Sequence, residues 1–213
     1  MTDRTSHLHN NKATWISIQR PGREGTAVPK SALLVMDVQR AVVDRYPDPY
    51  YLSRLQGATH AARAAGLAVI YVVVGFRPNY PEVSVRNKMF GGLTRGGQMP
   101  GRDDAMQIHP DVAPRPDDIV VTKRRVSAFA GSDLEMVLRA SEIDCLVLAG
   151  IATSGVVLST LRQAADLDFG LTVLADGCLD GDAEVHRVLT EKVFPNQADV
   201  MTVADWMAAL DTR

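Results

Sequence analysis

Two side chains with complementary acid–base chemistry stand at the ends of predicted strands. Asp37 follows the apolar run 32–36, and Lys123 ends the short run that begins at Ile119. In an open parallel sheet, ligands bind beyond the carboxyl ends of the strands, so these side chains are candidates to meet in one crevice. A carboxyl group can move a proton, and a nearby ammonium group can stabilise developing negative charge. Residue types alone leave simpler roles open, as a turn carboxylate and a solvated lysine.

A third strand end leads directly into a helix. The run 145–149 is followed by Gly150-Ile151-Ala152-Thr153-Ser154, and Ser154 is the predicted cap of a helix over 154–167. A helix N-terminus carries unpaired backbone N–H groups and a partial positive charge. This end therefore suits an anionic group of a substrate.

The elements that would position these groups alternate between strands and helices. Strands are predicted at 32–36, 67–74, 119–121, 145–149, 171–175 and 198–201, and helices at 52–65, 132–140, 154–167, 182–193 and 202–210. This alternation predicts an α/β fold: a three-layer, doubly wound, Rossmann-like six-stranded parallel sheet with helices on both faces.

The chain reads as one domain with a polar leading segment. Residues 1–30 are predicted to be an N-terminal extension, and residues 31–213 a single α/β domain. A long segment, 75–118, connects the second and third strands. Segments of this length within a compact domain are usually functional, so a lid, a substrate contact or a subunit contact is expected there.

Composition excludes several classes of protein. The 213 residues carry 23 Lys and Arg against 25 Asp and Glu, so a formal charge of −2 argues against nucleic-acid binding. No apolar run reaches membrane-spanning length, and the first residues do not resemble a secretory signal. We therefore expect a cytoplasmic protein with a small-molecule substrate and no membrane partner. The histidines are scattered without metal-ligand spacing, so neither a metal nor an organic cofactor is predicted.

Three segments carry a family resemblance. Residues 33–39, 108–129 and 150–154 resemble, in order and spacing, three motifs of the isochorismatase-like (cysteine hydrolase) superfamily. The resemblance covers roughly residues 31–210. It implies the same six-stranded parallel sheet and, because relatives commonly self-associate, a homo-oligomer, either a dimer or a tetramer.

The resemblance also assigns roles within the predicted crevice. It implies that Asp37 is the catalytic acid/base residue and that Lys123 is its catalytic partner. It further implies a cis peptide bond near Ile151-Ala152, which turns backbone N–H groups toward the substrate. The predicted substrate-binding residues are Ala152, Ser154 and Val156.

The chain departs from the superfamily at the nucleophile. The nucleophilic cysteine of the superfamily falls three residues after the motif threonine, Thr153, and that position here is Val156. Of the two cysteines, Cys145 is predicted to be a buried strand residue, while Cys178 follows the fifth strand in a loop near the crevice rim. No histidine lies near Thr153 in the sequence, and His186 is predicted to be structural. The sequence thus predicts a member that lacks the nucleophilic cysteine.

These features favour a hydrolase of a small polar substrate, of the vinyl-ether type that cysteine-free members cleave. Asp37 would donate a proton to carbon, and water would then attack the resulting cation. Lys123 lowers the pKa of such a carboxyl group while burial raises it, and the sequence leaves open which effect dominates. Two alternatives also remain open: a C–N amidohydrolase that uses water or Cys178, and a catalytically silent protein that binds a small molecule.

Overall fold

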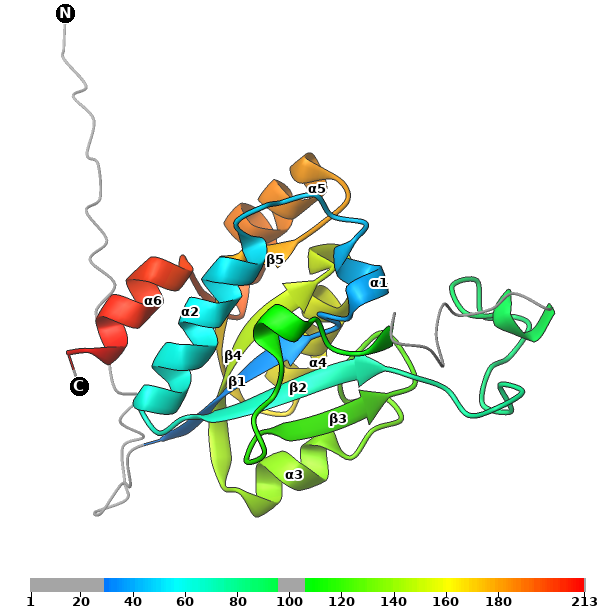
Figure 1. Ribbon diagram of the computed structural model, residues 1–213, viewed down its shortest axis with the longest axis horizontal. Helices are drawn as coiled ribbons and strands as arrows, with labels where there is room; N and C mark the ends of the chain where they lie inside the picture. The colour runs from blue at the N-terminus through cyan, green and yellow to red at the C-terminus, as the bar shows by residue number, and fades with distance from the viewer. Residues whose placement is uncertain (1–28, 96–105, 213) are drawn as a thin grey trace, which may run out of the picture.

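A six-stranded, entirely parallel sheet forms the centre of the molecule (Figure 1). The computed structural model describes residues 29–95 and 106–212. The strands lie in the order β3-β2-β1-β4-β5-β6. Their bounds are β1 (Lys30–Met36), β2 (Ala68–Val74), β3 (Ile119–Lys123), β4 (Ile143–Ile151), β5 (Gly170–Leu179) and β6 (Asp199–Met201). The predicted extension 1–30 lies outside the described residues except for its last two, and Lys30 already begins β1.

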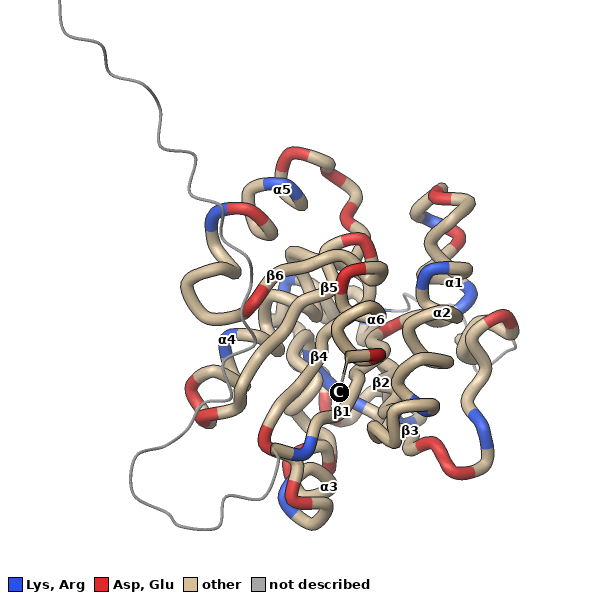
Figure 2. Tube along the Cα trace, turned by 90° about the vertical axis from the view of Figure 1, so that its left-hand side faces the viewer, with Lys and Arg blue, Asp and Glu red and all other residues tan. Residues whose placement is uncertain are grey.

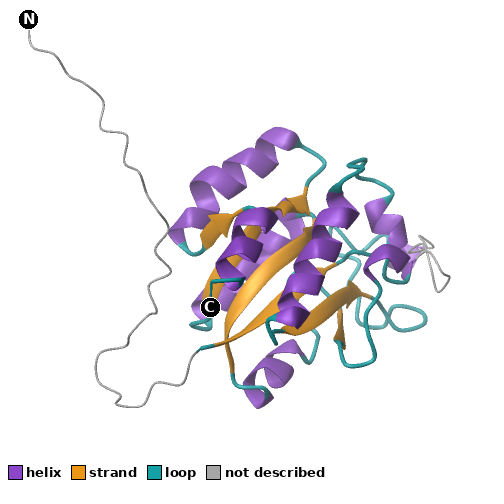
Figure 3. Ribbon diagram, turned by 60° about the vertical axis from the view of Figure 1, so that its left-hand side comes forward, coloured by secondary structure: helices purple, strands orange, loops and turns teal. Residues whose placement is uncertain are grey.

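Helices cover both faces of this sheet (Figures 1 and 3). The α-helices are α1 (Arg40–Val43), α2 (Tyr51–Ala64), α3 (Leu134–Ala140), α4 (Leu158–Asp166), α5 (Ala183–Val188) and α6 (Val203–Leu210). Shorter helical turns are η1 (Leu93–Arg95), η3 (Pro110–Val112), η4 (Thr153–Val157), η5 (Leu189–Val193) and η6 (Phe194–Asn196). The predicted three-layer α/β fold is confirmed.

Each helix layer packs on its own hydrophobic core. On one face, Leu55 and Ala58 of α2 pack with Trp206 of α6 against the buried side chains that β1 and β4 direct toward that face. On the other face, Leu138 of α3 and Leu161 of α4 pack against the opposite side chains of the same strands. Because β1 and β4 are buried on both faces, their sequences are continuous apolar runs, which is the pattern that revealed them.

The strand order reverses direction between β1 and β4. From β1 the chain crosses to β2 through α2 on one face, whereas from β4 it crosses to β5 through α4 on the other face. The segments that follow β1 and β4 therefore diverge where these neighbouring strands end. Such a switch point is where open α/β sheets bind ligands. Asp37 immediately follows β1, and Ala152 immediately follows β4.

The fifth strand, β5, is longer than the apolar run 171–175 predicts. The segment Asp176-Gly177-Cys178 was expected to be a loop, but it continues β5, and Cys178 pairs with Gly150 of β4. A register irregularity between Leu148 and Gly150 allows the strand to continue past polar and glycine residues. The prediction of a loop at the crevice rim is therefore wrong.

The first part of the connection between β2 and β3, residues 75–95, projects from the body of the protein (Figure 1), whereas η3 near its end packs beside α2. Within its described part, Phe76 makes edge-to-face contacts with Tyr80 and Phe90, at centroid distances of 6.1 and 5.2 Å. Val85 and Met89 are exposed. The segment thus has a small aromatic cluster of its own, and residues 96–105 lie outside the described part of the chain.

Charged residues of both signs are interspersed along the helices and loops (Figure 2). This distribution agrees with the near-zero net charge of the sequence. No helix within residues 29–95 and 106–212 has both the length and the apolar character that crossing a bilayer requires.

Gly150 provides a test of how closely β4 must approach β1. Its φ is 150°, and a Cβ atom at this position would collide with the carbonyl oxygen and Cβ of Met36. We expect Gly150→Ala to lower the free energy of unfolding by more than about 3 kcal/mol, measured by urea denaturation. A Cβ atom at Gly92 meets nothing within 4 Å, so Gly92→Ala is the matched control. Equal stability of the two variants would contradict the close approach.

Candidate active site

Asp37 and Lys123 form a buried ion pair at the carboxyl edge of the sheet. Lys123 Nζ lies 2.8 Å from Asp37 Oδ2, and the two residues are only 2% and 8% exposed. Because β2 lies between β1 and β3, the long lysine side chain must extend past β2 to reach the aspartate. Lys123 Nζ also donates a hydrogen bond to the carbonyl oxygen of Arg125, at 3.0 Å. The structure therefore brings together the two residues predicted to be catalytic.

Burial controls the proton affinity of Asp37. Desolvation raises the pKa of Asp37 from 3.8 to about 6, although the Lys123 ammonium group and its hydrogen bond act to lower it. The other carboxylate oxygen, Oδ1, is buried and has no hydrogen-bond partner among the described residues. A carboxyl group with this pKa can exist in both protonation states near neutral pH, as a proton donor or acceptor requires.

Gln39 fixes the chain that follows Asp37. Its side chain is buried, accepts a hydrogen bond from Val74 N at 3.0 Å and donates to the carbonyl oxygen of Met106 at 2.7 Å. Asp37 itself has a φ of 55° and its N–H donates to Val72 O at 2.8 Å. The end of β1 is thus tied to the end of β2 and to the long connection, which holds the aspartate in place. Sequence reasoning gave Gln39 no such role.

The end of β4 turns sharply into η4. The Ile151-Ala152 peptide bond is cis, as the family resemblance implies. The carbonyl oxygen of Ala152 accepts hydrogen bonds from Gly155 N and Val157 N, at 3.0 and 3.2 Å. Met36 pairs with Gly150 across β1 and β4. Asp37 and Ile151, the next residues along the two strands, therefore lie side by side.

The three residues predicted to bind substrate occupy different environments. Ala152 is partly exposed, whereas Val156 is buried in the core beneath α4. Ser154 was predicted to cap a helix, but its N–H donates to Asp180 Oδ2 at 2.7 Å and its side chain caps nothing. The helical chain begins one residue earlier, at Thr153, with Ala152 as the residue before it. The capping prediction for Ser154 is therefore wrong.

Thr153 has a partner that the sequence did not reveal. Its Oγ1 lies 2.8 Å from Nδ1 of His186, and Thr153 is completely buried. His186 lies on α5, which follows β5, the neighbour of β4. Only the adjacency of β4 and β5 could have suggested this pairing, since the two residues are 33 positions apart.

Both cysteines lie in strands. Cys178 is 1% exposed in β5, its Sγ contacts Leu148 O at 3.9 Å, and burial raises the pKa of its thiol to about 12. Cys145 lies near the start of β4, at the edge opposite the carboxyl ends, and is partly buried. It is a strand residue as predicted, although less buried than expected.

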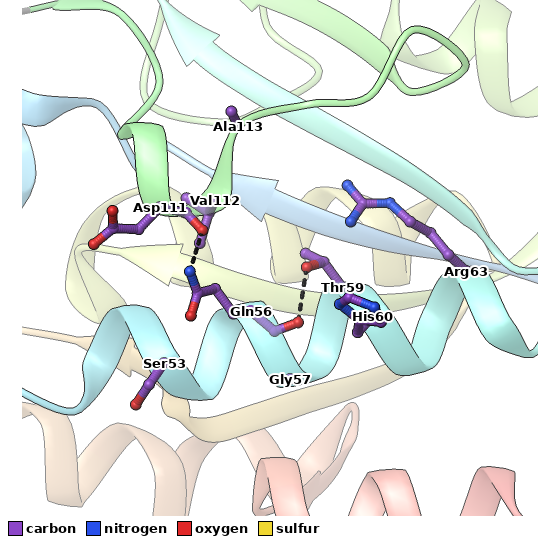
Figure 4. A pocket seen from close by; sticks show the side chains of 9 residues that line it. All are labelled: Ser53, Gln56, Gly57, Thr59, His60, Arg63, Asp111, Val112 and Ala113. Atoms are coloured by element: carbon purple, nitrogen blue, oxygen red, sulfur yellow. Dashed lines mark hydrogen bonds between the residues drawn. The ribbon is translucent and has the colours of Figure 1, made fainter.

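A separate groove of about 540 Å³ lies between α2 and η3 (Figure 4). None of the predicted catalytic or substrate-binding residues lines it. Its polar groups are largely satisfied within the protein: Gln56 donates to Asp111 O at 2.6 Å, and Thr59 donates to Gln56 O at 3.1 Å. Across the described residues, no group of three or more His, Cys, Asp or Glu side chains is arranged to hold a metal ion.

The burial of Cys178 predicts that its thiol is chemically inert. Only the thiolate reacts, and a pKa of about 12 leaves on the order of one thiolate in ten thousand at pH 8. We expect iodoacetamide to leave Cys178 unmodified in the native protein and to modify it after denaturation, as read by peptide mass spectrometry. Rapid native alkylation, with loss of hydrolytic activity, would contradict this assignment.

Comparisons with known proteins agree with this architecture. Residues 31–205 match the isochorismatase domain family. The chain is 31% identical over 189 residues to YecD, an uncharacterised isochorismatase family protein of Escherichia coli O157:H7, covering 84% of this chain and 96% of that protein. It is 32% identical over 233 aligned residues to the ureidoacrylate amidohydrolase RutB of Stutzerimonas stutzeri, covering 93% and 88%.

A solved structure gives the same result. An isochorismatase family protein from Burkholderia thailandensis matches with a TM-score of 0.77 and 29% identity, covering 87% of this chain and 98% of that one. The sequence match, the shared fold and the extent of coverage lead to one conclusion: the chain belongs to the isochorismatase family of hydrolases.

Proposed function

We propose that this hydrolase cleaves a small polar substrate by acid–base catalysis at Asp37 and Lys123, without a cysteine nucleophile. The favoured reaction is hydrolysis of a vinyl ether. One observation carries the proposal: the Asp37–Lys123 pair is buried at the strand switch point, and the pKa of Asp37 is about 6. At pH 7 about a tenth of such a carboxyl group is protonated and able to act as an acid.

The proposed reaction begins with a proton transfer from Asp37 to the terminal carbon of the vinyl ether. The ether oxygen then shares the positive charge of an oxocarbenium-like cation, which water attacks while Asp37 takes back a proton. The resulting hemiketal breaks its C–O bond to the original ether oxygen. The hemiketal hydroxyl loses its proton and becomes the carbonyl group, and the departing oxygen gains a proton and leaves as an alcohol. Lys123 stabilises the Asp37 carboxylate in the interval between its two proton transfers.

Backbone groups after β4 are proposed to bind an oxygen of the substrate. Ala152 and Val156 are the preferred donors, because the N–H of Ser154 already donates to Asp180. The turn into η4 and α4 directs the positive end of a helix toward this edge of the sheet. A carboxylate on the substrate fits this environment.

The absence of a cysteine nucleophile is the second part of the proposal. Val156 stands where the family resemblance puts the reactive thiol, and an alkyl side chain cannot attack a substrate. Two observations support a cysteine-free mechanism: Cys178 is buried with a raised pKa, and Cys145 lies at the far end of β4.

A C–N amidohydrolase is the second candidate, favoured by the similarity to a ureidoacrylate amidohydrolase. In that case Asp37 would act as a general base that activates water for attack on a carbonyl carbon.

The proposal also includes a small molecule as the binding partner and self-association into a dimer or tetramer. The exposed apolar side chains of Val85 and Met89 support the self-association. A cytoplasmic location stays a prediction.

The pH dependence of kcat/KM distinguishes the two reactions. If Asp37 is a general acid, kcat/KM is constant below about pH 6 and falls about tenfold per pH unit above it, because the protonated fraction falls. If Asp37 is a general base, kcat/KM rises tenfold per unit up to about pH 6 and then levels off. The measurement uses a panel of small vinyl ethers and small amides at several pH values.

Asp37→Asn tests whether the carboxyl group carries the reaction. We expect it to lower kcat by about 10²- to 10⁴-fold, because the amide cannot exchange the proton. The exposed Asp117 provides the matched control, Asp117→Asn, with unchanged activity expected. Full turnover by Asp37→Asn would overturn the proposal. If no substrate is hydrolysed by the wild-type protein and a panel compound only raises its Tm, the silent binding protein is the correct alternative.

Lys123→Met tests the electrostatic role of the lysine. The ammonium group lowers the pKa of Asp37, so its removal raises that pKa above about 6. We expect the pH limb of kcat/KM to move to higher pH by about one unit or more. Lys192→Met removes an exposed lysine and serves as the control. A limb that stays in place or moves to lower pH would contradict the proposed coupling.

A further inference from the structure

Asp180, which lies between β5 and α5, and His186, which lies on α5, hold the segment that follows β4. His186 Nδ1 lies 2.8 Å from Thr153 Oγ1, and Asp180 Oδ2 accepts a hydrogen bond from Ser154 N at 2.7 Å. The two contacts involve consecutive residues directly after the cis Ile151-Ala152 bond. The segment is therefore held from outside its own strand and helix.

The start of α5 and the residues before it, which supply these side chains, are themselves ordered by hydrogen bonds. Asp182 caps α5 by accepting from the N–H groups of Glu184 and Val185, at 2.9 and 3.2 Å. Asp180 Oδ1 accepts from Asp182 N at 3.3 Å. This arrangement fixes the start of α5, and His186 lies one turn further along the same helix.

The surroundings of His186 favour its neutral form. Burial lowers the pKa of His186 below its ordinary value, and the Asp180 carboxylate opposes this effect. A neutral ring with its proton on Nε2 presents Nδ1 as an acceptor, so the Thr153 hydroxyl can donate to it. Thr153 is fully buried and its hydroxyl is engaged by His186, which argues against a nucleophilic role.

We propose that His186 is a positioning residue that, through Thr153, fixes the backbone of residues 152–156 beside Asp37. The inference rests on the proposed function, in which Ala152 and Val156 bind an oxygen of the substrate. The register of β1 with β4 places Ile151 adjacent to Asp37, so a shift of this segment changes the distance between the substrate and the acid. Displacements of about 1 Å can lower turnover by two orders of magnitude.

The proposal predicts that loss of the His186–Thr153 contact lowers turnover while substrate binding and global stability change little. Without the His186–Thr153 contact, the segment samples more conformations, fewer of which align the substrate with Asp37. The loss therefore falls on kcat. Backbone N–H groups of residues 152–157 also become more accessible to solvent, which hydrogen exchange detects without any substrate.

The experiment compares five variants of the full chain, one of which is the double variant His186→Ala/Thr153→Val. His186→Ala and Thr153→Val each remove one side of the contact, and His186→Asn keeps a polar atom near the position of Nδ1. His60, exposed on α2, supplies the control His60→Ala. We measure amide hydrogen exchange of residues 152–157 by NMR or peptide mass spectrometry, and kcat and KM on the substrate identified from the panel.

We expect exchange in this segment to rise about tenfold in His186→Ala and Thr153→Val, and to stay unchanged in His60→Ala. We also expect kcat to fall about tenfold or more in both, with KM within about threefold of wild type, and the double variant to be no worse than either. His186→Asn should recover most of both losses.

Two results would overturn the inference. One is unchanged exchange and kcat in both His186→Ala and Thr153→Val. The other is an increase in exchange that is uniform across the chain, because that reports lower overall stability rather than local positioning. Failure of the proposed function is recognised separately: Asp37→Asn would retain turnover, whatever the exchange of residues 152–157 shows.

Discussion

Asp37 and Lys123 place opposite charges 2.8 Å apart in the interior of the protein, where each loses most of its contact with water. Removing two charges from water costs several kcal/mol, which their attraction repays only when the geometry is good. That geometry requires three neighbouring strands in register, a buried Gln39 behind Asp37, and close contact between Gly150 and Met36. The same burial gives Asp37 a pKa of about 6, so the structural constraint also sets its capacity for proton transfer.

The sheet topology places the Asp37–Lys123 pair along one side of the candidate site. The connections after β1 and β4 leave on opposite faces, so the backbone after β4 can turn toward Asp37 without meeting α2. The backbone after β4, which forms the other side of the site, is held by Asp180, directly after β5, and by His186 of α5. Acid–base chemistry and proposed oxygen binding therefore depend on elements that span most of the chain.

Much of the fold and part of the proposed site follow from local patterns. The apolar runs of β1, β2 and β4 are long because both faces of these strands are buried. Asp37 directly follows the run of β1, and Lys123 is the last residue of β3. The prediction failed where tertiary contacts override local preference. Cys178 continues β5 because pairing with β4 satisfies its backbone, and Ser154 does not cap because its N–H meets Asp180.

The sequence by itself determined the element order, the parallel sheet and the residue types at the ends of β1, β3 and β4. Burial of one face imposes a period and burial of both faces gives a continuous apolar run, and a linear pattern records both. The tertiary structure alone decided that burial outweighs Lys123 in setting the pKa of Asp37, and that His186 meets Thr153. Desolvation and contacts between distant segments depend on how strands and helices are packed in three dimensions, and no local sequence pattern encodes those quantities.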